Sequence, residues 1–489
     1  MPLTHLIADQ YPVTTAPWPR FRVDRESWSR AAQTLASGEV SLVSLWAEPG
    51  QVHLALLDEA ASPAEIAILS LACPEGHFPS VGAHHAPAIR LERTIRDLFG
   101  LEPAGAPDIR PWLDHGQGAS YRFLGAEGPG LHQVPVGPVH AGIIEPGHFR
   151  FTVHGETVVR LEERLGYVHR GLEGLLAGAP LDRAIRLAGR ASGDSTVAYA
   201  LAFARAAEAA LGIEAPARAA SIRAVMAELE RLANHLGDIG AIANDAAFAL
   251  MLAHCGILRE RVLRTADEVF GHRLMMDRIA IGGVATDLTG AGLRHIRALT
   301  TYVRRYFPGL VQLYDRTASL QDRTVGTGIA KPDLVRRFAA GGFIGRASCR
   351  AFDVRRALPY PPYDRLAFEM PVRGEGDVNA RVWIRILEVE QSLALIDRIL
   401  ERLPDGPVAT SLPAIDGTGR EGVALVEGFR GDIFAWLSLD GEGRVARCHL
   451  RDPSWFQWPL LEAAIEGNIL ADFPLCNKSF NCSYAGHDL

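Results

Sequence analysis

The residues best suited to chemistry are concentrated between Gly137 and Leu176. Besides four histidines, this stretch carries Glu145, Arg170 and Glu173. Histidine titrates close to neutral pH, and a neighbouring carboxylate can exchange protons with it. The same residues would also suit a surface hairpin whose polar groups are all satisfied. The spacing therefore leaves two interpretations open, a redox or proton-transfer cavity and a plain hairpin. The four histidines are His140, His148, His154 and His169.

The pattern around these residues predicts a hairpin followed by a short helix. Phe149, Phe151 and Val153 alternate with polar neighbours, which indicates a half-buried strand. Residues 154–156 would form a tight connection, and residues 157–161 the return strand. Beyond Gly166, the apolar residues between 167 and 175 predict a short helix with His169, Arg170 and Glu173 beside its apolar face.

The totals describe an ordinary globular protein with a large core. The chain has 489 residues, enough for two to four domains, and is 48% hydrophobic and 22% charged. Its net charge of −7 gives no reason to expect nucleic acid. The six cysteines form no CxxC pair, which argues against a disulfide framework or a zinc ribbon and fits a reducing compartment.

No segment reads as a membrane or secretion signal. The N-terminus lacks a basic region followed by an apolar run, so we expect no secretory signal. The most apolar long stretch, 241–258, is interrupted by Asn244, Asp245 and His254 and predicts a buried helix. Membrane association is therefore expected only through partners.

Composition and turn signals predict a fold of the α+β class in four parts. In the small domain, two apolar runs at 40–46 and 52–57 predict a hairpin, and residues 66–71 suit either a helix or a strand. Residues 88–99 predict an amphipathic helix with Ile89, Ile95, Leu98 and Phe99 facing inward and Gly100 as its cap. The expected boundaries are 1–20 for a tail, 21–113 for a small α/β domain, 114–136 for a linker and 137–489 for a large domain.

For the large domain, the sequence pattern predicts a helical bundle joined to a β meander. Gly193-Asp194-Ser195 supplies a capping start for an alanine-rich helix that runs to 208. Glu230, on the next helix, is expected on a solvated face. Apolar residues at spacings of three and four indicate bundle packing. The expected helices are 217–239, 256–275, 291–307, 378–403 and a terminal one at 457–469. The expected strands are 422–427, 431–439 and 444–450.

Several motifs carry a family resemblance. GPVHAGIIEPGHFRF at the start of the large domain and GYVHRGLEGL after it resemble the large subunit of energy-converting [NiFe]-hydrogenases of the formate hydrogenlyase type. They also resemble the 49-kDa quinone-site subunit of respiratory complex I. The segments AELERLANH, DRTVGTG and PYPPYD follow in the family's order. Residues 91–113 resemble the signature of the 30-kDa subunit of complex I. This implies that a domain like the 30-kDa subunit is fused to the N-terminal side of the large domain.

The resemblance also locates what the chain has lost. A nickel–iron centre needs thiolate ligands from two CxxC pairs. The aligned positions are Ala188 and Ala191 in the first pair and Ser483 and Gly486 in the second, none of them a cysteine. The resemblance therefore predicts no metal site in this chain.

The quinone ligands of complex I are missing as well. The position of the quinone-binding histidine aligns with Ile144, and that of its tyrosine partner falls near Gly189. The chain thus retains the motifs of the cavity wall and matches neither chemistry in full. A substitute acceptor, such as a quinone bound in another way, stays open.

The resemblance implies an oxidoreductase subunit of the NADH:quinone oxidoreductase or hydrogenase type. It would line the redox-coupling cavity in the peripheral arm of a membrane-bound, complex-I-like assembly, on the cytoplasmic side of the inner membrane. Its expected partners are a small subunit with a 4Fe-4S cluster and antiporter-like membrane subunits. The alternatives are an active hydrogenase large subunit and a non-catalytic scaffold. The candidate site residues are His140, Glu145, His148, His169, Asp194 and Arg346.

Overall fold

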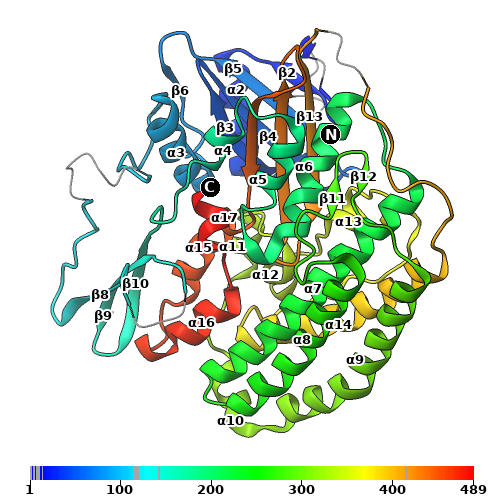
Figure 1. The fold of residues 1–489 in the computed structure, drawn as a ribbon. Coiled ribbons are helices and arrows are strands. Elements are labelled where there is room, and N and C mark those ends of the chain that lie inside the picture. The colour runs from blue at the N-terminus through cyan, green and yellow to red at the C-terminus, as the bar shows by residue number, and fades with distance from the viewer. Residues whose placement is uncertain are drawn as a thin grey trace.

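The computed structural model describes most of the chain. The described residues are Leu3, Leu6, 11–13, 15–113, 121–140, 144–413 and 417–489. Parts of the expected tail at 1–20 and of the expected linker at 114–136 lie outside them. The molecule mixes helices and sheets, so the predicted α+β class is confirmed. Figure 1 shows the strands of the N-terminal domain at one end and the long helices at the other.

A five-stranded sheet forms the N-terminal domain. Its order is β1-β2-β5-β4-β3, with all neighbours antiparallel except β2 and β5. The predicted hairpin is confirmed as β3 and β4, and the ambiguous stretch 66–71 is a strand. The strands are β1 (Tyr11–Val13), β2 (Arg20–Arg22), β3 (Ser41–Glu48), β4 (Gln51–Asp58) and β5 (Glu65–Ala72).

Two helices and a small ribbon accompany this sheet. Gly100 caps α3 in the left-handed region at φ 66°, as predicted, because a glycine adopts that conformation without steric cost. Ile95 is buried, whereas Leu98 is 44% exposed, so its predicted inward position was wrong. The helices are α2 (Arg25–Ser37) and α3 (Ile89–Phe99), and the ribbon pairs β6 (His77–Pro79) with β7 (Glu102–Ala104).

The predicted hairpin of the histidine-rich stretch is confirmed, and a third strand joins it. Strands β9 and β10 pair from the turn at 154–157, and β8 adds to the outer edge of β9. Strand β8 comes from residues that the sequence placed in the linker. Helix α4 begins only at Leu172, because residues 166–171 form a turn with both glycines at positive φ. The elements are β8 (Leu131–Val136), β9 (His148–His154), β10 (Thr157–Arg164) and α4 (Leu172–Leu176).

Long helices form the bundle of the large domain. The expected single helix over 241–258 is two helices, divided by a turn in which Ala247 has a φ of 64°. The major helices are α5 (Leu181–Ala188), α6 (Thr196–Leu211), α7 (Ala217–Asp245), α8 (Ala249–Phe270), α9 (Gly290–Arg316) and α14 (Val378–Glu401). Shorter pieces are β11 (Ile279–Ala280), β12 (Gly283–Val284), α10 (Ala318–Thr324), α11 (Pro332–Arg337), α12 (Gly342–Ala347) and α13 (Val354–Ala357).

The predicted meander is confirmed and packs tightly on α6. A side chain at Gly422 would meet the carbonyl oxygen of Ala206 at 1.9 Å, so only glycine allows this approach. Its last strand also reaches the N-terminal sheet, where Arg451 Nε donates to the carbonyl of Val43 at 2.8 Å. The strands are β13 (Arg420–Glu427), β14 (Asp432–Leu439) and β15 (Val445–Arg451).

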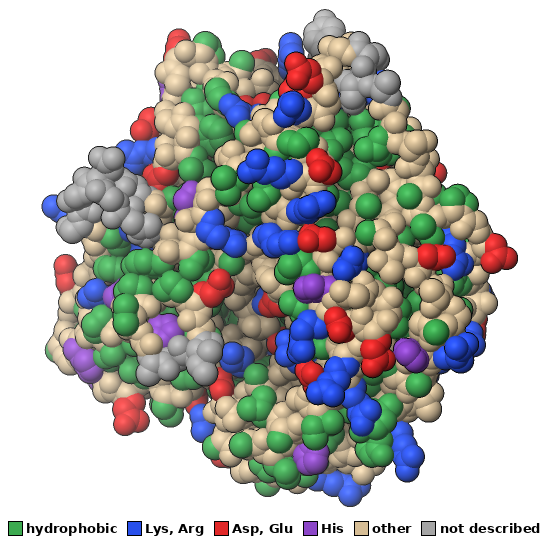
Figure 2. All heavy atoms as spheres, viewed as in Figure 1, with side chains coloured by type: hydrophobic (Ala, Val, Ile, Leu, Met, Phe, Trp, Pro, Cys, Tyr) green, Lys and Arg blue, Asp and Glu red, His purple; other side chains and the backbone are tan. Residues whose placement is uncertain are grey.

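The chain ends in three short helices instead of the single one predicted at 457–469. The first stops at Ala464, and Gly467 then takes a φ of 80°. Figure 1 shows these helices between the β8–β10 sheet and the bundle, and Figure 2 shows a hollow in the surface near the centre of the same face. They are α15 (Ser454–Ala464), α16 (Phe473–Phe480) and α17 (Tyr484–Asp488).

None of the helices in the described ranges combines the length and the apolar character needed to span a bilayer.

Candidate functional site

Two segments about 290 residues apart in sequence meet at the start of α6. Ser192 Oγ and Ser483 Oγ lie 2.9 Å apart and share a hydrogen bond. Both serines are buried. Ser483 also begins α17, where its hydroxyl accepts a hydrogen bond from the backbone N–H of Gly486. We name the polar residues gathered here the convergence cluster, and its members are Glu145, His169, Ser192, Asp194, Arg430, Ser483 and Asp488.

An ion pair anchors the convergence cluster. Arg430 donates to both carboxylate oxygens of Asp194, at 2.7 and 2.5 Å, and its Nε donates to the carbonyl of Asn481 at 2.5 Å. Burial alone would raise the pKa of Asp194, but the guanidinium of Arg430 lowers it below the usual value. Asp194 is therefore an anion that binds an arginine. The N-cap residue of α6 is Ser195, within the predicted start at Gly193-Asp194-Ser195, but its side chain makes no capping hydrogen bond.

Glu230 provides the side-chain cap of α6. Its carboxylate accepts hydrogen bonds from the backbone N–H groups of Val197 and Ala198, at 2.7 and 3.0 Å. These are first-turn donors of α6, which have no partner within the helix. Glu230 is buried, so the prediction of a solvated face was wrong. Burial raises its pKa to about 8.

Glu145 and His169 reach the convergence cluster from the histidine-rich stretch. A carboxylate oxygen of Glu145 accepts from the N–H of Ala485 at 3.2 Å, and His169 Nδ1 lies 2.6 Å from the carbonyl oxygen of Asp488. Burial, with the nearby charges of Asp194 and Asp488, raises the pKa of Glu145. Glu145 is thus the member of the cluster best prepared to take up a proton.

At the four positions that the resemblance aligns with metal-binding cysteines, the structure leaves no side chain available to bind a metal ion. Ala188 and Ala191 are fully buried and have no ligating atom. The hydroxyl of Ser483 is already hydrogen-bonded to the hydroxyl of Ser192 and to the backbone N–H of Gly486. A side chain at Gly486 would lie 2.5 Å from Asp452 Oδ2, a carboxylate already bonded to the hydroxyl of Tyr199.

The two cysteines in this region do not replace the missing ligands. Cys476 and Cys482 are buried, and burial raises the pKa of both thiols, that of Cys476 to about 11. A buried, protonated thiol is a poor metal ligand. Across the described part of the chain, no three His, Cys, Asp or Glu side chains are grouped so as to hold a metal ion. The residues present do not fit a nickel–iron centre.

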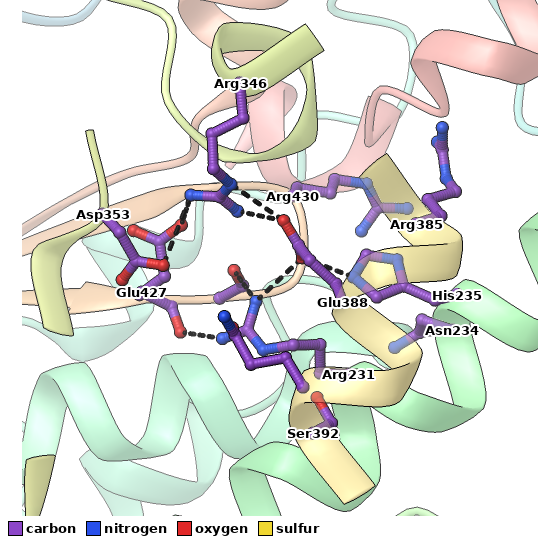
Figure 3. A network of polar contacts seen from close by, with 12 residues as sticks. Arg231, Asn234, His235, Arg346, Asp353, Arg385, Glu388, Ser392, Glu427 and Arg430 are labelled. Carbon is purple, nitrogen blue, oxygen red and sulfur yellow. Dashed lines mark hydrogen bonds and ion pairs between the residues drawn. The ribbon is translucent and has the colours of Figure 1, made fainter. Parts of the chain in front are cut away.

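A second polar group lies deeper, between α7, α12, α14 and the meander (Figure 3). Arg346 Nε donates to Glu388 at 2.8 Å, and its Nη1 donates to Glu427 at 2.9 Å. His235 Nε2 lies 2.7 Å from the other oxygen of Glu388. All four side chains are inaccessible to solvent or nearly so. We name this set the inner network, and its members are Glu228, His235, Arg346, Asp353, Arg355, Glu388 and Glu427.

The inner network continues toward the tyrosines of the loop before α14. Arg355 binds Asp353 through two hydrogen bonds, at 3.0 and 2.6 Å, and donates to Glu228 at 2.8 Å. The hydroxyl of Tyr363 donates to the same oxygen of Glu228 at 2.7 Å. Each buried charge thus has a partner of opposite sign, which limits the cost of removing it from water.

The carboxylates of the inner network differ in proton affinity. Burial alone would raise the pKa of Glu388, but Arg346 and the hydrogen bond from His235 hold it far below the usual value. For Glu427, burial and the negative charge of Asp353 raise the pKa to about 7. Neighbouring carboxylates whose pKa values lie far apart can hold one proton at a defined position.

The convergence cluster and the inner network are connected. Asn481, whose carbonyl binds Arg430, donates its side-chain amide to Asp238 at 2.9 Å. Asp238 pairs with Arg385 at 3.0 Å, and the charge of Glu388 acts on Arg385. Figure 3 shows Arg385 and Arg430 beside Glu388 and His235. A polar path therefore leads from Asp194 to the centre of the large domain.

The six predicted site residues fall into three places. Glu145, His169 and Asp194 come together in the convergence cluster, and Arg346 lies in the inner network. His148 is on the hairpin, where its Nδ1 lies 2.8 Å from the carbonyl oxygen of Gly137 and its ring packs on Phe123. His140 is half-buried beside Gly137. The partners described for His148 all lie outside the convergence cluster.

Sequence reasoning missed the residues that organise both groups. Arg430, Glu388 and Glu427 received no role. One signal was available for Glu427 and Arg430, because they are charged residues inside the apolar run VALVEGFRGDIFAW, where charges are uncommon without a partner. Ser192 and Asp488 carried no comparable signal.

Known proteins resemble most of this chain in sequence. The model of the respiratory-chain NADH dehydrogenase 49 Kd subunit matches residues 238–423 and 415–488. Formate hydrogenlyase subunit 5 of Escherichia coli (strain K12) is 32% identical over 441 residues, which cover 84% of this chain and 77% of the relative. An NADH-quinone oxidoreductase subunit of Roseiflexus sp. (strain RS-1) is 32% identical over 352 residues, 70% of this chain and 94% of the relative.

A solved structure has the same fold. It belongs to the membrane-bound sulfane sulfur reductase, described as an archaeal respiratory membrane complex. The match has a TM-score of 0.69 and 27% identity, and it covers 73% of this chain and 98% of the other.

Proposed function

Because the chain belongs to the family of the 49-kDa subunit of respiratory-chain NADH dehydrogenase, we propose that it is a peripheral-arm subunit of a membrane-bound, complex-I-like oxidoreductase. It would sit on the cytoplasmic side of the inner membrane, next to a small subunit with a 4Fe-4S cluster and above antiporter-like membrane subunits. The relatives support this role, since two are named as subunits of formate hydrogenlyase and of NADH-quinone oxidoreductase, and the solved structure is described as a respiratory membrane complex.

We propose that this subunit works without nickel and iron of its own. The support is the kind of residue at the four aligned ligand positions. Two are alanines, one is a serine already hydrogen-bonded to Ser192, and one is a glycine packed close to Asp452. The electron acceptor would instead be a quinone-type or other small molecule bound beside the convergence cluster. The chain itself would supply hydrogen bonds and protons to that acceptor.

The observation that carries the proposal is the polar path from the convergence cluster to the inner network. Negative charge that arrives beside Glu145 would raise its pKa further and favour proton uptake there. The same charge would act on the Asp194–Arg430 ion pair. Through the contacts of Asn481, Asp238 and Arg385, a shift of that pair would alter the electrostatic surroundings of Glu388. A buried set of paired charges is suited to this because low-dielectric surroundings screen it weakly.

The proposal can be tested on the purified complex. Reduced methyl viologen would serve as donor and ubiquinone-1 as acceptor, with nickel measured per chain. Glu145→Gln should lower quinone reduction at least tenfold and flatten its pH dependence. Glu156→Gln, in the exposed turn of the hairpin that follows Glu145, is the matched control and should change neither.

Other outcomes would favour the alternatives. Nickel near one per chain, or hydrogen oxidation, would contradict the metal-free proposal and favour an active hydrogenase. An assembled complex whose quinone reduction is unchanged by Glu145→Gln would contradict the proton role. A complex that assembles fully and transfers no electrons would favour a scaffold, for which the closed ligand positions are the supporting observation.

A further inference from the structure

A cavity of about 430 Å³ lies along the C-terminal half of α6, whereas the convergence cluster lies at the start of that helix. Helices α6 and α7, strand β13, the loop at 360–363 and the segment at 16–18 form its walls. Its size falls within the range of small-molecule sites. Most of the lining is apolar, with Trp18, Leu201, Ile213 and Val423 among the wall residues.

One guanidinium in this cavity lacks an anion among the residues that the structure describes. Arg205, partly buried on α6, lies over the ring of Tyr360 with its Cζ 4.5 Å from the ring centre. Within those same residues it has no hydrogen-bond acceptor or ion-pair partner, and its Nε is shielded from solvent. Burial lowers the pKa of Arg205. A charge that is removed from water without a counter-ion is costly, so this position favours an added anion.

The neighbouring arginine shows the contrast. Arg223 lines the same cavity and donates to both oxygens of Glu208, at 3.1 and 2.5 Å, and to two backbone carbonyls. Both oxygens of Glu208 are thus bound to Arg223, and one of them also accepts from the N–H of Gly282 at 2.7 Å, so this carboxylate does not pair with Arg205. The pair is neutral and leaves Arg205 as the cation available to a ligand.

The surroundings restrict the kind of anion. Glu208 and Glu214 both lie close enough for their charges to act on Arg205, which disfavours a phosphate with two negative charges. A carboxylate carries one charge and matches the planar fork of a guanidinium. The aromatic and aliphatic walls would bury an apolar body, as Trp18 and Tyr360 offer ring faces.

We propose that this cavity binds a monocarboxylate with a small apolar or aromatic body, held by a charge-assisted hydrogen bond from Arg205. The carboxylate would complete the ion pairing of Arg205, and the body would occupy the space between Trp18 and Tyr360. Tyr363 lines the same cavity and binds Glu228 of the inner network, so the ligand would lie one residue away from that network.

Benzoate is the probe, measured by isothermal titration on the purified complex. Binding should be at least tenfold weaker with Arg205→Met, and benzyl alcohol and inorganic phosphate should bind more weakly than benzoate. Because Arg205→Met breaks no hydrogen bond within the described residues, the unliganded variant should be at least as stable to heat as the parent. Glu214→Gln, which removes a competing charge at an exposed position, should tighten benzoate binding a few fold.

Two results would overturn the proposal. One is equal affinity of benzoate for the parent and Arg205→Met. The other is phosphate or benzyl alcohol binding at least as tightly as benzoate. If Arg205→Met fails to assemble, the Glu214→Gln variant decides, since an unchanged or weaker benzoate affinity there contradicts a site built on the charge of Arg205.

Discussion

Arg430 holds both carboxylate oxygens of Asp194, at 2.7 and 2.5 Å, although the two residues are 236 positions apart. The pair joins the meander to the start of α6, close to the place where Ser192 and Ser483 meet. The guanidinium is buried, whereas the Asp194 side chain is 36% exposed. The pair therefore acts at the boundary between the protein interior and the face where an acceptor would bind.

Asp194→Asn should destabilise the protein because Arg430 would stay buried with a weaker partner. The free energy of unfolding should fall by about 1–3 kcal/mol, below the usual range for a fully buried pair because solvent reaches Asp194. Urea unfolding of the complex measures the loss. Asp333→Asn, in an exposed pair with Arg336, is the control and should stay within about 0.5 kcal/mol. Equal losses in the two variants would contradict this account.

Glu388→Gln should be costlier, because Arg346 and His235 both bind this fully buried carboxylate. A loss of about 3–5 kcal/mol is expected. Glu390→Gln, two residues along α14 and exposed, should change stability by less than about 0.5 kcal/mol.

The cost of Glu388→Gln should also depend on pH. Because the folded-state pKa lies below the ordinary 4.5, the stability that Glu388 contributes is complete above pH 4.5 and is lost as the pH falls toward the folded value. The difference between the parent and the variant should narrow below pH 4.5, as followed by urea unfolding at several pH values. A constant difference would contradict an ionised Glu388.

Glu230 should give a pH dependence of opposite sign. Its pKa of about 8 in the folded protein lies above the ordinary 4.5, so the unfolded chain loses this proton at a lower pH than the folded one. The free energy of unfolding should therefore fall as the pH rises from 5 to 8. Glu230→Gln should flatten that part of the curve and cost about 1 kcal/mol at pH 5 through the weaker cap. Melting temperatures at pH 5, 6, 7 and 8 test this, with Glu390→Gln as the control that keeps the slope.

Gly486→Ala should destabilise the C-terminal helix, since its Cβ would lie 2.5 Å from Asp452 Oδ2. Overpacking of this kind costs about 1–3 kcal/mol. Gly256→Ala is the matched control, because that helical glycine has nothing within 4 Å of its added Cβ and should gain about 0.5–1 kcal/mol. If Gly486→Ala proves neutral, the ligand position is more open than the structure indicates.

The long helices and the meander could be predicted from the sequence because their causes are local. Apolar residues at spacings of three and four define α7, α9 and α14, and period-two runs between glycines define β13 to β15. The division of 241–258 at Ala247 was missed, since a single residue in the left-handed region leaves no periodic signal. The same holds for the division of the C-terminal region into three helices.

The candidate site was predictable only in part. Glu145, His169, Asp194 and Arg346 were selected from their types and motifs, yet their partners were not. Arg430 binds Asp194, and Glu230 caps α6, across separations that no sequence pattern encodes. His140 and His148 were selected on the same grounds, and His148 lies on the hairpin with its described partners outside the cluster.

By itself, the sequence determined the family, the helical and strand periodicities and the absence of thiolates at the four ligand positions, because each depends on residue types at fixed positions. Only the tertiary structure decided which buried charges meet. Ion pairing requires proximity in space, and proximity between residues such as Asp194 and Arg430 arises from the packing of the whole domain. For that reason the polar path, the closure around Gly486 and the guanidinium of Arg205, unpaired among the described residues, became visible only in the folded chain.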